Sequence, residues 1–262
     1  ISACLVGSEM CIRDRCWIHD AFYLEYAQKE HDAFANILRE AGSEVLYMEE
    51  LLAEAMDANP VARAAFLDEY MAQAPIPDPA LVPLVREKLD AIEGNRELVA
   101  KALAGMRLHE LDLASGPRTL SRLEGDGLAP DDFVVYSMPS SYFSRDPIAS
   151  IGTGVALHRM YYNQRNREVP FYKTFLTYHP DFAGTPFWYD NHSAAHIEGG
   201  DVLNINETTL AVGISERTEA AAIDTLAHNL FWGEEPSAID TVYAIRTVSY
   251  THLRAHETGR NL

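Results

Sequence analysis

Apolar residues near the start of the chain recur at helical spacing. Over residues 17–41 the spacing is three and four residues, as on one face of an amphipathic helix. The stripe consists of Phe34, Ile37, Leu38 and Ala41. Gly42 follows it and predicts a left-handed stop to the helix. The next apolar run, residues 45–48, is typical of a short buried strand.

The segment 49–113 has a different character, because it is rich in Ala, Leu and Glu and contains few strand signals. Asn59 and Asp78 are each followed by a proline, the pattern of a helix N-cap with proline in the first turn. A further helical stripe stops at Gly94. These features predict a small all-helical region, followed by a loop over residues 114–132.

From residue 133 strand patterns dominate, and one order of elements occurs twice. The expected strands are 133–135, 155–157, 202–205, 210–214 and 242–245, and the expected helices lie near 168–178 and 218–231. Aligning Asp146 with Asp201, an offset of 55 residues (201 − 146), superimposes two strand–turn–strand–helix patterns. An arginine follows the second strand in each, Arg165 and Arg217. This weak internal repeat favours a radial or stacked α/β architecture.

Composition limits the classes of protein to consider. A hydrophobic share of 47 % is that of a globular protein, and no apolar run approaches the length of a membrane span. With 21 Lys and Arg against 39 Asp and Glu, the net charge of −18 disfavours nucleic acid as a partner and would attract a small cation. We therefore expect neither a nucleic-acid nor a membrane partner.

The three cysteines, Cys4, Cys11 and Cys16, all lie in the first sixteen residues. The remainder of the chain therefore offers no thiol for a disulfide framework, a zinc–thiolate site or a nucleophile. A signal-peptide pattern is not found in the first residues, so the expected compartment is the cytoplasm. Residues 1–15 and 248–262 resemble translated sequencing-adapter sequence, and we treat them as foreign to the fold.

Polar clusters of the second half carry the candidate chemistry. Glu198 and Asp201 are separated only by two glycines, which allow close approach of a ligand. Phe143 lies near Asp146, and an aromatic face beside an acid suits a planar cation. Carboxylates match a guanidinium bidentately, and an arginine such as Arg217 would grip a substrate carboxylate in the same way. Each cluster taken singly is also a turn-forming string.

Taken together, the clusters resemble the bacterial arginine deiminase family. The strings are MPSSYFSRDPIASIGTGV (138–155), HIEGGDVLNINETTLAVGISERT (196–218) and RELVAKALAG (96–105), in the family's order. The resemblance covers essentially all of residues 17–247. It implies a pentein-type α/β propeller of ββαβ modules around a substrate channel, with an inserted all-helical domain. The implied divisions are a partial first module at 16–48, the helical insertion at 49–131 and two further modules at 132–247.

The resemblance also implies a role for each candidate residue. Asp146 and Glu198 would hold the substrate guanidinium, with Glu198 assisting proton transfer, and Arg165 and Arg217 would bind the substrate α-carboxylate. Phe143 would form an aromatic wall, and Asp201 would support these groups. The implied reaction converts free L-arginine to citrulline and ammonia through a cysteine thiolate and a proton-shuttling histidine. It needs no metal or organic cofactor, and the full-length protein is a possible homo-oligomer.

The chain departs from the family pattern at several places. Ser140 stands where the family has a substrate-contacting asparagine, which makes specificity for arginine less secure. The family's His-x-Asp motif and nucleophilic cysteine are not found. His252 lies in the adapter-like segment, and Arg254 stands two residues after it, where the motif has Asp, so we assign it no role. We therefore expect this chain, as written, not to turn over arginine. A partial propeller also leaves sheet edges uncovered, which predicts poor solubility or stability.

Three other interpretations remain open. A metal-dependent hydrolase would use His192 and His196, with His179, Glu198 and Asp201 nearby in the sequence. The His-x-Glu string also occurs in zinc deaminases, but these need a downstream Pro-Cys-x-x-Cys. A non-catalytic arginine-binding relative is the second alternative. Another guanidino enzyme, such as an amidinotransferase, is the third.

Overall fold

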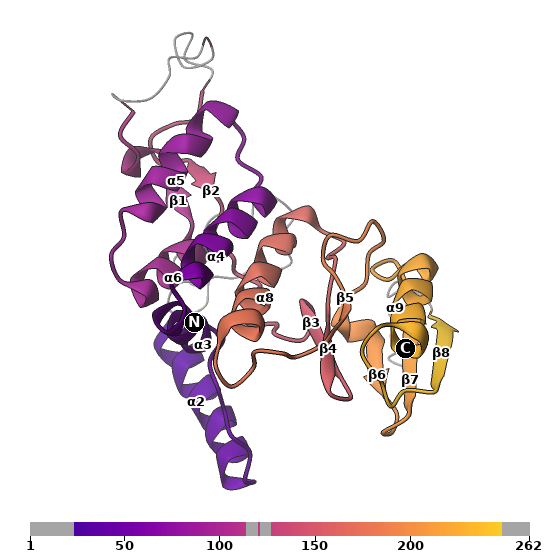
Figure 1. Ribbon diagram of the computed structural model, residues 1–262. Helices are drawn as coiled ribbons and strands as arrows, with labels where there is room; N and C mark the ends of the chain where they lie inside the picture. The colour runs from indigo at the N-terminus through magenta and orange to yellow at the C-terminus, as the bar shows by residue number, and fades with distance from the viewer. Residues whose placement is uncertain (1–23, 114–119, 121–126, 248–262) are drawn as a thin grey trace, which may run out of the picture. The chain divides into compact units, whose positions relative to one another are not determined.

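The computed structural model describes residues 24–113, 120 and 127–247, which form two compact units (Figure 1). Unit 1 holds the described residues up to 142 together with 174–183. Unit 2 holds residues 143–173 and the described residues from 184 onward. The segments expected to be adapter-derived, 1–15 and 248–262, lie outside the described residues.

Unit 1 is mainly helical, as the sequence predicts. Its helices are α2 (Leu24–Glu40), α3 (Met48–Ala58), α4 (Pro60–Gln73), η2 (Pro79–Leu81), α5 (Val82–Asp90), α6 (Asn95–Ala104) and η3 (Leu108–Glu110). The predicted caps are confirmed, since the side chain of Asn59 accepts a hydrogen bond from Val61 N (3.0 Å) and that of Asp78 accepts one from Ala80 N (2.9 Å). Gly42 ends α2 at a φ of 87°, the left-handed conformation expected of it.

Two details of unit 1 differ from the sequence prediction. The run 45–48 is not a strand: residues 45–47 are irregular, and Met48 opens α3. Tyr47 O accepts hydrogen bonds from Glu50 N and Leu51 N, so this backbone already starts a helix. The stripe on α2 is not buried either, because Phe34 and Ile37 are each 62 % exposed within the described structure.

A two-stranded antiparallel sheet completes unit 1. Strand β1 (Met106–Arg107) pairs with β2 (Phe133–Val135), which the sequence predicts, whereas β1 lies in the region interpreted as all-helical. This short strand forms only by pairing with a strand about 27 residues away in the chain. The local sequence therefore shows no alternating hydrophobic pattern that would predict it. Gly105 precedes β1 at a φ of 76°, and a Cβ there would lie 2.4 Å from Val135 O.

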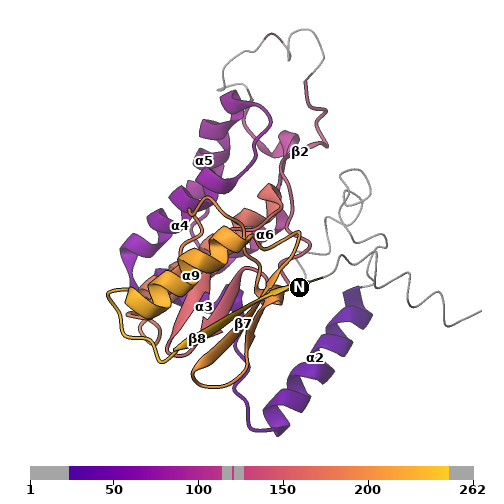
Figure 2. The same cartoon turned by 90° about the vertical axis from the view of Figure 1, so that its right-hand side faces the viewer.

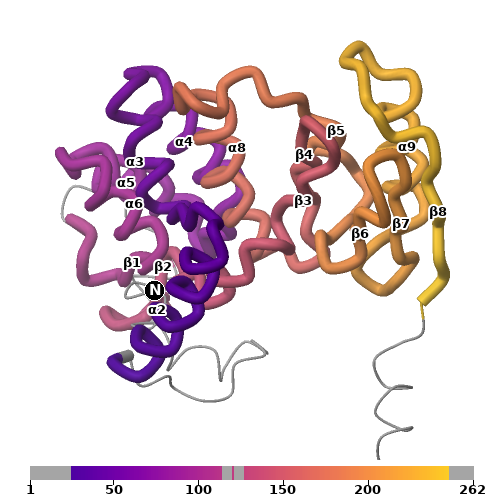
Figure 3. The backbone as a smooth tube through the Cα atoms, turned by 90° about the horizontal axis from the view of Figure 1, so that it is seen from below, coloured from indigo at the N-terminus to yellow at the C-terminus, as the bar shows by residue number. Residues whose placement is uncertain are grey.

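Unit 2 contains the repeat predicted from the sequence. The first group of elements is β3 (Ile148–Ile151), β4 (Gly154–Leu157), η4 (Asn163–Glu168), α8 (Val169–Tyr178) and β5 (Phe187–Tyr189). The last residues of α8, from Thr174 on, are counted with unit 1. The second group is η5 (Gly199–Asp201), β6 (Val202–Asn204), β7 (Thr209–Ile214), α9 (Ala220–Trp232) and β8 (Thr241–Arg246). Figure 3 shows β3–β5 and β6–β8 as neighbouring groups of strands.

Strand pairing is the same in the two groups. The first two strands are antiparallel, and the second and third are parallel and joined through a helix. Each group is therefore a ββαβ unit in a mixed α/β fold, and the repeat is confirmed. Figure 2 shows α9 lying against the β7–β8 pair. Closure of such units into a propeller stays a prediction.

One hydrophobic core joins the two ββαβ units. It contains Ile151 and Trp188 of the first together with Val212 and Leu226 of the second. Trp188 is 2 % exposed, and its indole Nε1 donates a hydrogen bond to Ile151 O at 2.8 Å. The backbone oxygen of Trp188 accepts a hydrogen bond from Asn229 Nδ2 on α9 at 2.9 Å. The loops that follow the strands are thus fixed relative to one another within unit 2.

Candidate active site

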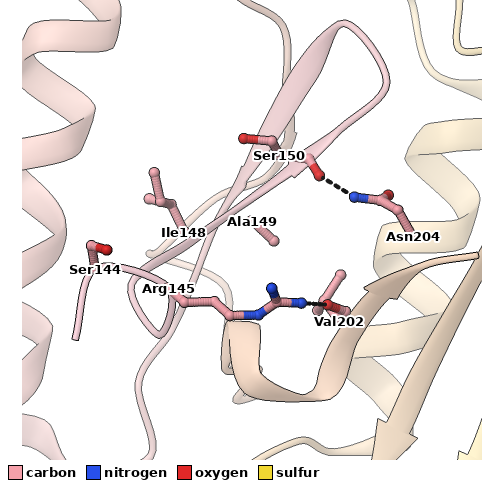
Figure 4. A pocket seen from close by; sticks show the side chains of 7 residues that line it. All are labelled: Ser144, Arg145, Ile148, Ala149, Ser150, Val202 and Asn204. Carbon is pink, nitrogen blue, oxygen red and sulfur yellow. Dashed lines mark hydrogen bonds between the residues drawn. The ribbon is translucent and has the colours of Figure 1, made fainter. Parts of the chain in front are cut away.

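Two loops of unit 2 meet at the candidate site, one from each ββαβ unit. Gly199 N donates a hydrogen bond to Asp146 O at 3.1 Å. Arg145 reaches back across the same junction and donates from Nε to Gly199 O (3.0 Å) and from Nη2 to Val202 O (2.6 Å), as Figure 4 shows for Val202. These bonds bring the Arg-Asp-Pro and Glu-Gly-Gly-Asp strings, 52 residues apart in the chain, into contact.

The two glycines between Glu198 and Asp201 were expected to allow close approach of a ligand, and the structure shows a different role for them. A Cβ on Gly199 would lie 1.9 Å from Arg145 O, so a side chain does not fit there. Gly200 has only Asp146 Oδ1 within reach, at 3.8 Å. Gly199 therefore admits the backbone of the neighbouring loop rather than a ligand.

Asp146, Arg165 and Glu168 form a network of charge-assisted hydrogen bonds. Arg165 Nη1 donates to Asp146 Oδ2 at 2.8 Å. Arg165 Nε and Nη2 donate to the two oxygens of Glu168 at 2.9 and 2.8 Å, the bidentate geometry of an Arg–carboxylate pair. Burial alone would lower the pKa of Arg165, but its bonds to Glu168 and Asp146 raise the pKa overall, so its positive charge is permanent.

Glu198 and Arg217 form the second ion pair of the site. Arg217 Nη1 donates to Glu198 Oε2 at 2.9 Å, and Tyr161 N donates to Glu198 Oε1 at 3.1 Å. The guanidinium carbon of Arg217 lies 4.5 Å from the ring centroid of Tyr162, a cation–π contact. Glu198 N donates to Thr218 Oγ1, which fixes the carboxylate relative to the turn that carries Arg217.

The two ion pairs share one electrostatic environment. Burial raises the pKa of Glu198; Arg217, the Tyr161 N–H and Arg165 oppose this shift, and the charge of Asp146 adds to it. Asp146 and Glu168 share the guanidinium of Arg165, and Glu198 pairs with that of Arg217. The structure thus brings together the four charged residues that the sequence singled out as guanidinium and carboxylate ligands.

Asp201 and Phe143 have different surroundings. Asp201 Oδ2 accepts a hydrogen bond from Ser215 Oγ at 2.6 Å, and Ser215 Oγ in turn accepts from Arg217 N (3.0 Å) and Thr218 N (3.2 Å). Asp201 is therefore connected to the turn that carries Arg217. Phe143 lies between two turns, three residues before Asp146, and is 47 % exposed.

His158 supports the loop of Asp146 from the end of β4. Its Nδ1 lies 2.8 Å from Asp146 O, and because a carbonyl only accepts, Nδ1 carries the proton. Within the described part of the chain, its Nε2 is buried without a hydrogen-bond partner. Burial lowers the pKa of His158 to about 4, so the imidazole is neutral at physiological pH.

An open depression of about 260 Å³ lies beside the junction of the two loops (Figure 4). Ser144, Arg145 and Asn204 are among its lining residues, and Asn204 Nδ2 donates a hydrogen bond to Ser150 O. Neither Asp146 nor Glu198 lines it. Because the guanidinium of Arg145 is engaged by two carbonyls, this depression is a consequence of the junction between the loops rather than the candidate site itself.

Two of the histidines considered as metal ligands have other partners. His196 Nδ1 lies 3.1 Å from a carboxylate oxygen of Glu219, and its ring contacts that of Tyr161. His179 belongs to unit 1, where its Nε2 lies 3.2 Å from Glu54 Oε2. Among the described residues, no three His, Cys, Asp or Glu side chains are gathered in a way that could hold a metal ion.

Sequence reasoning missed several residues that shape the site. Glu168, Tyr161 and Tyr162 each contact a charged group of the site. Glu168 was detectable in principle, because it stands three residues after Arg165, the spacing that brings side chains together on one helical turn. The tyrosines gave no signal, since their contact with Arg217 depends on tertiary structure.

The fold and the site define a mixed α/β protein of ββαβ units that pairs buried carboxylates with guanidinium groups. A family model described as "Arginine deiminase" matches residues 15–255. The chain therefore belongs to the arginine deiminase family, as its sequence motifs predict. No helix in the described residues is long and apolar enough to pass through a bilayer.

Curated relatives agree with this assignment. The chain is 44 % identical over 221 residues to the arginine deiminases of Streptococcus pyogenes and of its serotypes M1 and M3 (strain SSI-1). Each match covers 83 % of this chain and 53 % of the relative, so the chain spans about half the length of these proteins. Among solved structures, an adduct of a dimethylarginine dimethylaminohydrolase variant with S-methyl-L-thiocitrulline matches with a TM-score of 0.32, 15 % identity, and coverage of 49 % of this chain and 48 % of that one.

Proposed function

We propose that this chain forms the arginine-binding part of an enzyme that hydrolyses the guanidinium of free L-arginine to L-citrulline and ammonia. The observation that carries the proposal is the joint network of two carboxylates and two arginines, Asp146 with Arg165 and Glu198 with Arg217. A ligand with a guanidinium at one end and a carboxylate at the other complements both kinds of group.

Binding would proceed by exchange of ion-pair partners. Arg217 donates a hydrogen bond to the carboxylate of Glu198, the same contact that a substrate guanidinium would make. The substrate guanidinium would replace it on Glu198 and extend to Asp146, while the substrate carboxylate would take Arg217 and Arg165. Since every charge regains a partner, the exchange avoids leaving a buried charge uncompensated.

The two carboxylates would then orient the guanidinium carbon for nucleophilic attack. In the family that this chain resembles, a cysteine thiolate attacks that carbon, ammonia leaves, and water hydrolyses the covalent adduct. After Cys16 this sequence contains no cysteine. We therefore propose that the chain by itself binds arginine without releasing citrulline, and that the complete protein supplies the thiol and the proton-shuttling histidine.

Two finer points belong to the same proposal. The ββαβ units would be modules of a pentein-type propeller, with residues 49–131 inserted between the modules at 16–48 and 132–247. Ser140, in place of the family asparagine, would offer the substrate a shorter hydroxyl group instead of an amide.

The experiment is a calorimetric titration of the 262-residue chain with L-arginine and with agmatine, which lacks the carboxylate. Agmatine should bind at least about tenfold more weakly, because one lost charge-assisted interaction is worth about 1.5–3 kcal/mol. Equal binding of the two ligands, or no binding of L-arginine, would contradict the proposal. A colorimetric assay for citrulline on the same sample should give no signal, and turnover would show that the chain holds its own nucleophile.

A further inference from the structure

Glu168 carries a buried carboxylate that the proposed function does not use. Its side chain is 3 % exposed, and both oxygens accept hydrogen bonds from Arg165. An isolated buried carboxylate is costly, so the partner is essential to it. The same two bonds define the plane and direction of the Arg165 guanidinium, because a bidentate carboxylate contact fixes the orientation of the guanidinium as well as its position.

The segment that carries Glu168 is itself held firmly. It belongs to η4, and the side chain of Asn166 accepts from Met160 N at 2.8 Å and donates to Met160 O at 3.3 Å. Arg167, which is 1 % exposed, donates to Gln164 O. The segment between Arg165 and Glu168 is therefore held to the preceding backbone by side-chain hydrogen bonds, which restricts the geometry of the pair.

The two arginines of the site differ in this respect. Arg165 donates to two carboxylates at once, and its side chain is 12 % exposed. Arg217 donates to Glu198 from one nitrogen, rests on the ring of Tyr162, and is 30 % exposed. Replacing the single ion pair of Arg217 is cheaper than dismantling the network of Arg165, so the arginine that moves on ligand binding is Arg217.

We propose that Glu168 is a positioning residue that holds Arg165 in a fixed orientation to bind the ligand carboxylate. Arg217 is the arginine that exchanges Glu198 for the ligand carboxylate. This role rests on the proposed function. A preoriented anchor binds a carboxylate without first losing side-chain freedom, so Glu168 contributes to the preference for ligands with a carboxylate. It contributes much less to recognition of the guanidinium end, which the other carboxylates contact.

The first measurement needs no ligand. In the 15N-labelled full chain, the Nε–H of Arg165 should exchange slowly with water, because it is buried and donates to Glu168. The signal is assigned by its disappearance in Arg165→Lys. Glu168→Gln should accelerate this exchange at least about tenfold, whereas Glu207→Gln, the same change in the exposed β6–β7 turn, should leave it unaltered. Unaltered exchange in Glu168→Gln would overturn the inference.

The second measurement compares ligands. In the wild type and in Glu207→Gln, L-arginine should bind more tightly than agmatine by the same ratio. In Glu168→Gln this ratio should fall by about tenfold, with the affinity for agmatine changed less than threefold. An unchanged or larger ratio would overturn the role of Glu168, whereas a wild type without preference for arginine would overturn the proposed function and the ligand part of the inference with it.

A conservative variant guards against misfolding. Glu168→Asp keeps the charge but withdraws both oxygens by one methylene, and it is analysed in the same way if Glu168→Gln loses its cooperative unfolding transition. Its exchange rate and its ligand ratio should both lie between those of the wild type and Glu168→Gln. Values equal to the wild type in both measurements would show that charge alone suffices and would overturn the positioning role.

Discussion

At the scale of single residues, Glu198 combines a raised proton affinity with a task that requires its charge. Its side chain is 6 % exposed, and burial raises its pKa above the ordinary value of 4.5. Arg217 compensates that charge in the structure, and a guanidinium ligand would do so after exchange. The ionised form of Glu198 is therefore maintained by whichever guanidinium occupies it.

The affinity for L-arginine should consequently decrease as the pH falls through the raised pKa of Glu198. Affinity is full above that pKa, and below it each pH unit costs about tenfold, because the ligand binds the ionised form. The midpoint should lie above 4.5, the ordinary value for glutamate. Titrations between pH 4 and 8 test this. In Glu198→Gln the affinity should be weaker by about 10–100-fold, and this step should be missing from its pH profile.

At the scale of elements, the junction between the Arg145 turn and η5 determines where the site forms. Gly199 allows the two backbones to touch, and Arg145 bonds across the contact. The carboxylates of Asp146 and Glu198 are carried on the flanks of this junction. A change that separates the two backbones should therefore disturb both carboxylates together.

Gly199→Ala should destabilise unit 2 by about 2–4 kcal/mol, because its Cβ would overlap Arg145 O and the backbones would have to part. Gly200→Ala is the matched control, since its nearest atom lies at an ordinary contact distance of 3.8 Å. Urea unfolding of the two variants measures the difference. Equal midpoints would mean that the junction relaxes without cost.

Elements with a strong local period were predictable, and those that depend on distant partners were not. The helix α9 and the strands β4, β7 and β8 follow from apolar spacing and turn residues. The strand β1 and the exposed stripe of α2 did not, because pairing and burial are tertiary properties. For the site, the charged residues were readable from motif strings, but which carboxylate pairs with which arginine required coordinates.

At the scale of the whole molecule, the pH dependence of stability should include a contribution from His158. The pKa of the imidazole is near 6.5 in the unfolded chain and about 4 when it is buried. Between these pH values the unfolded chain binds a proton on His158 and the native chain does not. The native state is thus favoured above pH 6.5, and this advantage is lost progressively as the pH falls to 4. The loss amounts to about 3 kcal/mol at most.

Urea unfolding of the wild type and of His158→Gln at several pH values between 4 and 7 tests this contribution. Groups other than His158 titrate in both proteins, so the difference between the two pH profiles isolates the imidazole. The variant should be less stable at pH 7 because it loses the bond to Asp146 O, yet its profile should be flatter. Parallel profiles would contradict the assignment of a neutral, buried His158.

The core shared by the two ββαβ units has a consequence for the order of synthesis. Trp188 leaves the ribosome 41 residues (229 − 188) before Asn229, which bonds to it from α9. At about 5–20 residues per second, that interval lasts about 2–8 s, during which the indole lacks its final covering. The Asp146–Arg165–Glu168 network is already translated by then, whereas Glu198 and Arg217 follow. At this stage the nascent chain therefore contains the Arg165 network of the candidate site but not the Glu198–Arg217 pair, and its core is incomplete. The uncovered Trp188 would then offer a chaperone an aromatic surface to bind.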